Sequence, residues 1–470
     1  MAACTQQRGS FDAAVAYLHA LDRLNAHQHT SAYAFGYGIA RAKHLLARLG
    51  GARRATRRCV LVAGSKGKGS TAAMLTAMLS AAGYRVGLFT GPHLHTPLER
   101  FAISHGGRWE TMSEARFASL AERIAAILGC WDRPELGLPT RFEAFTAMAY
   151  RWFEEQAVDL AIMEIGIGGR QDAVNLAEPA LSVITNISLE HTQILGDTIA
   201  EIAWAKAGIL RAGGSAVIAP QTDEAKRVIL AEAHRLGMAE RLYFVEDHCT
   251  AKFSRLQAGA SGQWVCVRCH PRSPLVQVMG MSAELFCPLL GHWQLENLAT
   301  ALTALGALYE QGFVVHAPAI QAGLAGLRWP ARFEILRDAP LVIADGAHTP
   351  YAMARLRDSL RAYFSGRPRH FVLGVLRDKD AASMLKIIAE DAARITCTAP
   401  PLDRALPADQ LLAIWQTRFG DGHGPPVMQI SDPELALQRA LDEARPGDII
   451  CVTGSLHLAA QASRWLRARE

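Results

Sequence analysis

The sequence has 470 residues, and 49 lysine and arginine residues against 44 aspartate and glutamate residues leave a formal charge of +5. Half of the residues are hydrophobic and a fifth are charged, a balance that excludes an intrinsically disordered protein. The length predicts two or three domains. No apolar run approaches the ~18 residues of a membrane span. The small positive surplus argues against a nucleic-acid-binding protein.

The first residues and the cysteines indicate a reducing compartment. The start of the chain lacks the charged-then-apolar order of a secretory signal, and Asp12 interrupts the apolar stretch behind it. Nine cysteines, an odd number in a chain of this length, do not resemble a disulfide framework. We therefore expect a cytoplasmic protein without membrane or nucleic-acid partners.

Short apolar runs rich in β-branched residues alternate with helix-like stretches. Such runs are typical of strands buried on both faces of a parallel sheet. The predicted strands are 59–64, 84–90, 158–166, 181–187 and 215–220, and the predicted helices between them include 70–82 and 142–156. Gly83 is a plausible C-cap of the first of these helices. The pattern predicts an α/β domain with a mostly parallel sheet.

A second series of predicted strands follows Trp329-Pro330. These strands are 341–345, 371–375, 394–400, 427–431 and 448–454. Segment 262–288 keeps no clean period, so we interpret it as a peripheral excursion of the first domain. A helix over 295–309 then leads to a boundary near Leu327. The sequence thus predicts two domains, 1–327 and 328–470.

A glycine-rich segment between a predicted strand and a predicted helix is the strongest local signal. Gly64, Gly67 and Gly69 let backbone N–H groups approach phosphate oxygens, and the helix N-terminus adds positive potential. Lys68 supplies a charge for β- and γ-phosphates, and Ser70 or Thr71 offers a hydroxyl. A strand-to-helix turn without a ligand is the simpler alternative.

The same segment also fits the relaxed dinucleotide fingerprint Gly67-x-Gly69-x-x-Ala72, which would indicate an NAD enzyme. That interpretation needs an acidic residue at the end of the next strand, to bind ribose. The predicted strand 84–90 ends in Thr90 instead. The pattern therefore favours a nucleoside triphosphate.

Carboxylates follow the third predicted strand. Ligand sites in open α/β sheets lie at the carboxyl ends of strands, where Glu164 is well placed to hold Mg²⁺ against phosphates. The structural alternatives are a salt bridge between Glu164 and Arg170 and a helix-capping or turn-capping role for Asp172.

Two further candidates are weaker. His191 follows the fourth predicted strand, where it could bind a metal, polarise a phosphoryl oxygen or simply be solvated. Lys206 lies in a predicted helix over 199–210, and from spacing alone an exposed helix lysine is the default interpretation.

These motifs, in this order, resemble the folylpolyglutamate synthase/dihydrofolate synthase family of muramyl-ligase-type ATP-dependent amide ligases. The resemblance covers essentially the whole chain. It rests on segments 35–41, 63–70, 91–94 with 99–100, 164–172, 185–191, 206–209, 291–297, 329–332, 345–350, 378–380 and 453–455.

The resemblance implies a P-loop N-terminal domain, a smaller Rossmann-like C-terminal domain, and ATP with two Mg²⁺ ions as cofactors. It implies that ATP is bound by Gly64, Gly67, Lys68, Gly69, Ser70, Asn297, Arg332 and Asp345. The implied metal ligands are Glu164, His191 and Lys206, the last as a carbamylated lysine. With Lys68, these three form the implied catalytic set.

The resemblance also implies a pterin site and a reaction. The implied substrate-binding residues are Thr140, Arg141, Phe142, Glu143, Gln171, Asp172 and Ala173, with Phe142 available to stack on the ring. The implied enzyme joins L-glutamate to a pterin or folate carboxylate through an acyl phosphate, acts on small molecules alone and is expected to be a monomer. The alternatives are a ligase for another acid, an NAD-dependent oxidoreductase and a nucleotide-binding protein without catalysis.

Some positions depart from the family's pattern. Gly91 stands where a serine usually ligates Mg²⁺, so Thr90, Ser70 or a water would have to replace its hydroxyl. Lys66 and Thr349 each replace an asparagine, and Pro97-Leu98 replaces a pair that usually carries an aromatic residue.

The segment Cys266-Val-Arg-Cys269-His270 matches a haem-attachment pattern. Covalent haem of this kind needs an exported protein, and nothing in the sequence directs export. Cys249 and Cys287 lie nearby, but the spacing is wrong for a typical zinc site. We expect these cysteines to be packed or at an edge of the excursion.

Overall fold

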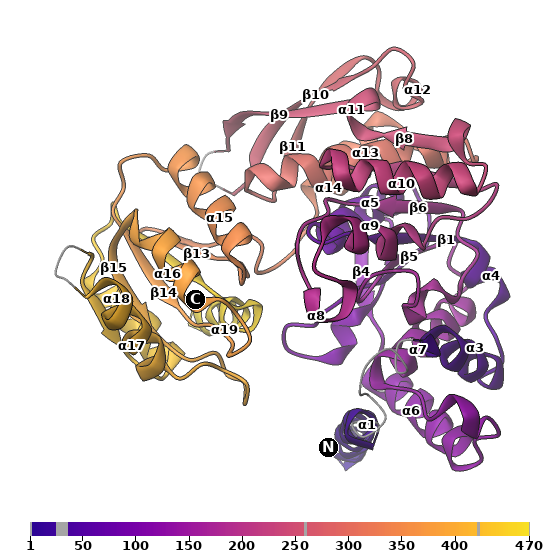
Figure 1. Ribbon diagram of the computed structural model, residues 1–470, viewed down its shortest axis with the longest axis horizontal. Coiled ribbons are helices and arrows are strands. Elements are labelled where there is room, and N and C mark those ends of the chain that lie inside the picture. The colour runs from indigo at the N-terminus through magenta and orange to yellow at the C-terminus, as the bar shows by residue number, and fades with distance from the viewer. Residues whose placement is uncertain (1, 25–35, 258–260, 421–423, 470) are drawn as a thin grey trace. The chain divides into compact units, whose positions relative to one another are not determined.

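The computed structural model describes residues 2–24, 36–257, 261–420 and 424–469, so Phe35 of the resembling segment 35–41 lies outside the described residues. The chain divides into two compact units (Figure 1). Unit 1 comprises Met1–Lys252, Cys266–Leu285 and Glu296–Leu327, and unit 2 comprises Phe253–Val265, Phe286–Leu295 and Arg328–Glu470. The assignment of 1–327 and 328–470 as functional domains stays a prediction.

Unit 1 is built on an eight-stranded sheet of order β4-β3-β2-β5-β1-β6-β7-β8. Its strands are β1 (Cys59–Ala63), β2 (Val86–Phe89), β3 (Phe101–His105), β4 (Arg108–Thr111), β5 (Leu160–Glu164), β6 (Leu181–Ile184), β7 (Ser215–Ile218) and β8 (Leu242–Phe244). The six strands from β2 to β8 in the sheet are parallel, as expected, and β3 and β4 are antiparallel. The sequence pattern does not predict β3, β4 and β8: β4 is fully exposed and β8 is three half-buried residues, whereas β3 is buried over most of its length.

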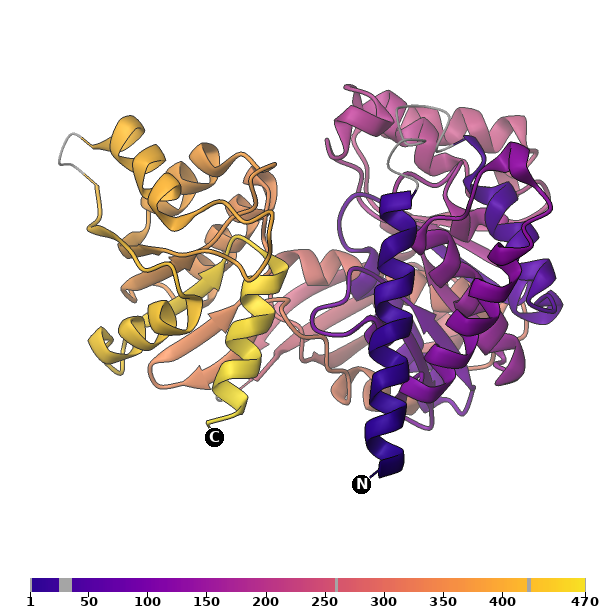
Figure 2. The ribbon, with the colours of Figure 1, turned by 90° about the horizontal axis from the view of Figure 1, so that it is seen from below.

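Unit 1 also contains helices. They are α1 (Ala2–Leu24), α3 (Gly38–Arg48), α4 (Arg53–Arg57), α5 (Lys68–Ala81), α6 (Glu114–Gly129), α7 (Arg141–Glu155), α8 (Thr192–Leu195), α9 (Ile199–Ala207), α10 (Asp223–Arg235), α11 (Val245–His248), α12 (Leu275–Met279), most of α13 (His292–Tyr309) and α14 (Ala317–Ala325). Figure 2 shows α1 as one long helix, which packs on α6. Helix α5 is buried along its length and packs on α14, where a Cβ at Gly323 would lie 2.5 Å from the Ala77 carbonyl oxygen. Gly83 follows α5 with φ of +96°, as its predicted C-cap role requires.

The predicted excursion, 262–288, supplies β10 and β11 of a three-stranded sheet of order β11-β10-β9, and β9 precedes it in the chain. The strands of this sheet are β9 (Cys249–Leu256), β10 (Gln263–Cys269) and β11 (Ser282–Cys287). The expectation that 262–288 keeps no period is wrong, because every second residue of β10 from Gln263 to Cys269 is buried. The division between the units passes through β9, β10 and β11, so the excursion does not belong to unit 1 alone.

Unit 2 contains a six-stranded sheet of order β12-β13-β17-β14-β15-β16. The strands are β12 (Glu334–Asp338), β13 (Leu341–Ala344), β14 (Arg369–Leu373), β15 (Ala392–Cys397), β16 (Val427–Gln429) and β17 (Ile449–Thr453). Only β12 is antiparallel, so the α/β class predicted from the sequence is confirmed here too. The helices are α15 (Pro350–Tyr363), α16 (Ala381–Ala389), α17 (Ala408–Phe419), α18 (Pro433–Glu443) and α19 (Leu456–Arg467).

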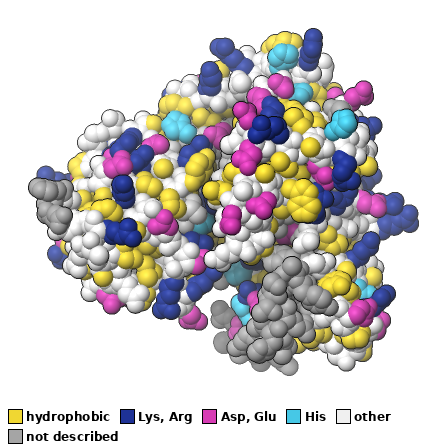
Figure 3. Space-filling view, in the orientation of Figure 1, with side chains coloured by type: hydrophobic (Ala, Val, Ile, Leu, Met, Phe, Trp, Pro, Cys, Tyr) yellow, Lys and Arg dark blue, Asp and Glu magenta, His cyan; other side chains and the backbone are white. Residues whose placement is uncertain are grey.

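Basic and acidic side chains are interspersed over the face shown in Figure 3. Within the described ranges, no helix combines the length and the apolar character that crossing a membrane would require.

Candidate functional site

The glycine-rich loop lies between β1 and α5 and rests on the segment that follows β6. Ser65 N–H donates to the Asn186 carbonyl at 2.7 Å, and the Ser65 hydroxyl donates to the Ser188 carbonyl at 2.8 Å. The Thr185 hydroxyl donates to the Lys66 carbonyl at 2.7 Å. A Cβ at Gly64 would lie 1.8 Å from the Thr185 hydroxyl oxygen, so only glycine allows this close approach.

The other end of the loop contacts α13. Gly67 precedes α5 with φ of +89°, and a Cβ there would lie 2.1 Å from the Asn297 side-chain oxygen. Asn297 is buried in α13. The structure therefore brings Asn297 to the glycine loop, although the two lie more than two hundred residues apart in the sequence. Ser70 and Thr71 are buried in the first turn of α5.

Three lysines surround Glu190, which the sequence analysis does not include among the site residues. Lys66 Nζ lies 3.0 Å from Glu190 Oε2, and Lys206 Nζ and Lys68 Nζ lie 3.5 and 4.0 Å from Oε1. Burial alone would raise the pKa of Glu190, but Lys68, Lys66 and Lys206 together lower it to about 2. We call these four residues the lysine cluster. Lys66 and Lys68 by themselves outnumber its one carboxylate, so the cluster carries a positive surplus.

Lys206 is 1% exposed, so the default interpretation of an exposed helix lysine is wrong. Its Nζ donates to the Gly64 carbonyl at 2.8 Å, which places it under the glycine loop. Burial and the neighbouring Lys68 lower the pKa of Lys206 to about 7, against the opposing effect of Glu190. A substantial fraction of this amine is therefore uncharged near neutral pH.

Glu164 ends β5, beside Val62 of β1 in the parallel register. It is buried, and its Oε2 accepts the Gly91 N–H at 3.1 Å. The alternative of a Glu164–Arg170 salt bridge is not what the structure shows: Arg170 donates to Glu232 at 2.7 Å. A Cβ at Gly91 would lie 2.4 Å from Arg100 Nη1, so Arg100 occupies the space of the missing side chain.

His191 is exposed and adopts a left-handed backbone conformation, with φ of +50°, immediately before α8. Partial desolvation of the imidazole by the surrounding protein is the largest cause that lowers the pKa of His191. The three lysines of the cluster lower this pKa further, whereas Glu190 raises it. A neutral imidazole is the form that binds a metal.

The predicted pterin segments lie side by side. A Cβ at Gly38 would lie 3.2 Å from the Gln171 carbonyl oxygen and 3.4 Å from Glu143 Oε1. The Phe142 ring is half-buried and reaches Gly166, where a Cβ would lie 2.6 Å away. Gln171 is exposed, whereas Ala173 is buried at the start of a 3₁₀ turn.

Several side chains of these segments serve the fold. Thr140 caps α7 and shares a capping box with Glu143, and Arg141 forms an ion pair with Asp22 at 2.9 Å. Asp172 caps the turn 173–176, as one alternative anticipates, and accepts three backbone N–H groups. Burial raises the pKa of Asp172 to about 6 despite these hydrogen bonds.

Arg332 and Asp345 belong to unit 2. Asp345 follows β13 and accepts N–H groups from Phe333 and Ala347, both at 2.8 Å. Burial raises the pKa of Asp345 to about 6, although Arg332 opposes the shift. Ala331 and Phe333, on either side of Arg332, have φ of +57° and +51°, so this turn is held in an uncommon conformation. The role of both residues toward a nucleotide stays a prediction.

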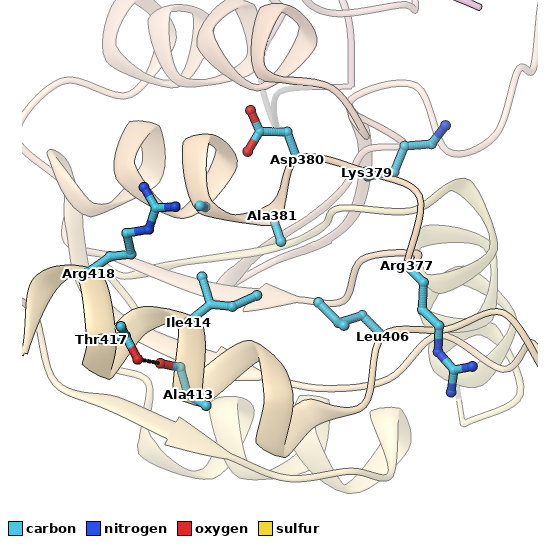
Figure 4. Close-up of a pocket in the computed structure, with 10 residues that line it drawn as sticks. Arg377, Lys379, Asp380, Ala381, Leu406, Ala413, Ile414, Thr417 and Arg418 are labelled. Carbon is cyan, nitrogen blue, oxygen red and sulfur yellow. Dashed lines mark hydrogen bonds between the residues drawn. The ribbon is translucent and has the colours of Figure 1, made fainter. Parts of the chain in front are cut away.

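Unit 2 also contains a cavity of about 450 Å³ between α16 and α17 (Figure 4). Leu406, Ile414 and Ala381 line its apolar part, whereas Lys379 and Arg418 point away from them. The predicted catalytic, ATP-binding, substrate-binding and metal residues do not line this cavity.

Comparison with known protein families assigns the chain to the Mur ligases. Residues 331–456 match the glutamate ligase domain of Mur ligases, and residues 135–305 match the Mur ligase middle domain. A Bacillus subtilis dihydrofolate synthase/folylpolyglutamate synthase is 31% identical, over 92% of this chain and 95% of that protein. A probable bifunctional folylpolyglutamate synthase/dihydropteroate synthase of Halobacterium salinarum is 36% identical over 90% of this chain. The chain spans only 49% of that protein and 46% of a similar one from Haloferax volcanii.

Solved structures of folylpolyglutamate synthases are also similar to this chain. A Mycobacterium tuberculosis folylpolyglutamate synthase complexed with ADP matches with a TM-score of 0.81 and 29% identity, over 96% of this chain and 99% of that one. An Escherichia coli homologue in complex with DHPP and ADP matches with a TM-score of 0.79 and 29% identity, over 97% of this chain and 98% of that one. The chain belongs to the folylpolyglutamate synthase/dihydrofolate synthase family of Mur ligases.

Proposed function

We propose that the protein is an ATP-dependent ligase that joins L-glutamate to a pterin or folate carboxylate. The lysine cluster under the glycine loop is the observation that supports this most directly, because it supplies cations where a triphosphate would lie. The similarity to ligases of this activity supports the choice of substrates. A dinucleotide role is disfavoured because β2 ends at Phe89 and is followed by Thr90, not by an acidic residue.

The proposed reaction has two steps. An oxygen of the acceptor carboxylate attacks the γ-phosphorus, and ADP leaves. The amino group of glutamate then attacks the acyl carbon and phosphate leaves, which forms the amide. Phosphoryl transfer depends on positioning and on neutralising spread negative charge. Lys68 and the N-terminus of α5 supply that charge from the protein.

The donor set fits Mg²⁺ in part. Mg²⁺ takes one or two carboxylates together with phosphate oxygens and waters, so Glu164 with His191 would hold one ion that neutralises phosphate charge. Gly91 offers no side-chain ligand, and the described residues contain no group of three or more potential metal ligands. A second ion would depend on carbamylation of Lys206, whose uncharged amine is the form that reacts with CO₂.

Glutamate-dependent ADP release tests the proposal, with dihydropteroate and tetrahydrofolate assayed in parallel and the products identified by mass. ADP should appear only when ATP, acceptor and L-glutamate are all present. If neither of these acceptors, and no other pterin or folate, supports ADP release, a ligase for a different acid or a protein without catalysis would be favoured. A monomeric, cytoplasmic enzyme acting on small molecules alone is part of the same proposal, and sedimentation velocity tests the monomer.

A further inference from the structure

Cys249 of β9 and Cys269 of β10 form a directly opposed pair. The sequence does not indicate this pair, because the Cys266-x-x-Cys269 spacing suggests Cys266 as the neighbour of Cys269. His270 N–H donates to the His248 carbonyl at 3.0 Å, so residues 248 and 270 are partners and 249 and 269 are the next pair. Directly opposed residues of an antiparallel pair have their side chains on the same face of the sheet, and both cysteines are buried.

The backbone hydrogen bonds define the type of pair. Cys269 N–H donates at 2.9 Å to the Met281 carbonyl, on the side of β11, and therefore not to β9. Cys249 and Cys269 are thus a non-hydrogen-bonded pair, in which Cα atoms lie about 4.5 Å apart and side chains come closest. That separation is within the range that a disulfide spans, about 4.4–6.8 Å.

The spacing along β10 excludes the alternative partner. Cys266 is three residues from Cys269 on one strand, so it lies on the opposite face and about 10 Å away. Two cysteines so placed cannot be bridged without moving the backbone.

We propose that Cys249 and Cys269 are a redox modification site that forms a reversible intramolecular disulfide. The oxidant is a low-molecular-weight disulfide such as oxidised glutathione. One cysteine thiolate attacks it, which leaves a mixed disulfide and releases one small thiol. The second thiolate attacks the protein sulfur of that mixed disulfide, which forms the Cys249–Cys269 bond and releases the second small thiol. The two protons lost by the cysteines are taken up by the two released thiolates, and the oxidant gains two electrons.

The position of the pair gives the modification a structural effect. β9 begins at Cys249 and β10 ends at Cys269, so the bond joins the two strands at the ends farthest from their connection along the chain. Cys249 and Cys269 are 4% and 5% exposed as whole residues, and burial raises the pKa of each thiol. The reaction should therefore be slower than the modification of exposed Cys130.

The full-length protein is incubated with oxidised glutathione, its remaining thiols are alkylated, and the unreduced digest is mapped by mass spectrometry. The expected result is a peptide linked through Cys249 and Cys269, lost on reduction with dithiothreitol. C249S and C269S should lack this cross-link, whereas C266S, changed on the other face of β10, should form it at the wild-type rate.

Three outcomes would overturn the proposal. They are a Cys266–Cys269 link in its place, a 249–269 link that forms only in urea, and no 249–269 link while Cys130 is modified. The wild-type peptide map decides by itself, so the test survives a variant that fails to fold.

Discussion

The lysine cluster and the predicted pterin segments, both in unit 1, use their charged side chains differently. In the cluster, three lysines share one carboxylate, so positive charge is left for an anionic ligand. In the pterin segments, Glu143 is matched by Arg41 in a buried bidentate pair, with both distances 2.8 Å. Substitutions of the charged residues in the first region should therefore reduce activity, and substitution of the Glu143–Arg41 pair in the second should reduce stability.

Lys68→Ala should give the largest effect, because it removes the charge that faces the transferred phosphoryl group. We expect kcat to fall by about 10³-fold, the scale seen when one transition-state donor is removed, with the denaturation midpoint unchanged. Lys226→Ala, which removes an exposed lysine paired with Glu246, is the matched control. Near-normal turnover of the Lys68 variant would contradict the phosphate-loop assignment.

Glu143→Gln should show the opposite behaviour. The variant leaves the Arg41 guanidinium buried without a matching charge, and such a change costs about 3–5 kcal/mol. Urea unfolding measures the free energy of unfolding. The control is Glu178→Gln, whose ion pair with Arg57 is exposed and should contribute at most about 1 kcal/mol. An equal loss of unfolding free energy in the two variants would contradict a stabilising role of the Glu143–Arg41 pair.

His370, in unit 2, is a buried side chain whose contribution to the free energy of unfolding should depend on pH. Its ring lies 2.8 Å from the Thr396 hydroxyl, and burial lowers its pKa to about 4 from 6.5. The unfolded chain then binds the proton more tightly, so the stabilisation is full above pH 6.5 and is lost as pH falls toward 4. We expect a loss of about 2 kcal/mol between pH 7 and pH 5. Denaturant unfolding at the two pH values measures it, and His370→Gln should abolish this component; an equal pH dependence in the variant would exclude His370 as its source.

Phe142→Leu should give the smallest effect. If the ring stacks on a pterin, its loss should raise the KM of the acceptor about tenfold, or ~1.4 kcal/mol, and leave the KM of ATP unchanged. Phe253→Leu, at an exposed position, is the control. A parallel rise in both KM values would indicate a general disturbance of unit 1.

The parallel strands of both units, apart from the half-buried β8, could be predicted from their apolar runs, because strands buried on both faces need continuous apolar sequence. Strand β4 could not, since an exposed strand at a sheet edge carries no such run, and β3, although buried over 101–104, is antiparallel and was not singled out. The alternation in β10 was missed because the polar Gln263 is at a buried position, whereas Trp264 and Cys266 occupy the half-buried positions.

The sequence by itself determined where the glycine-rich loop lies, because its glycines and Lys68 are adjacent in the chain between a strand and a helix. Only the tertiary structure decided which groups face that loop. Glu190 meets Lys66 across 124 residues, and Lys206 reaches the Gly64 carbonyl across 142, because the order of strands in the sheet brings β1 beside β6. Burial, which sets the charge of Lys206 and Asp345, likewise follows from packing between distant segments, which spacing along the chain does not encode.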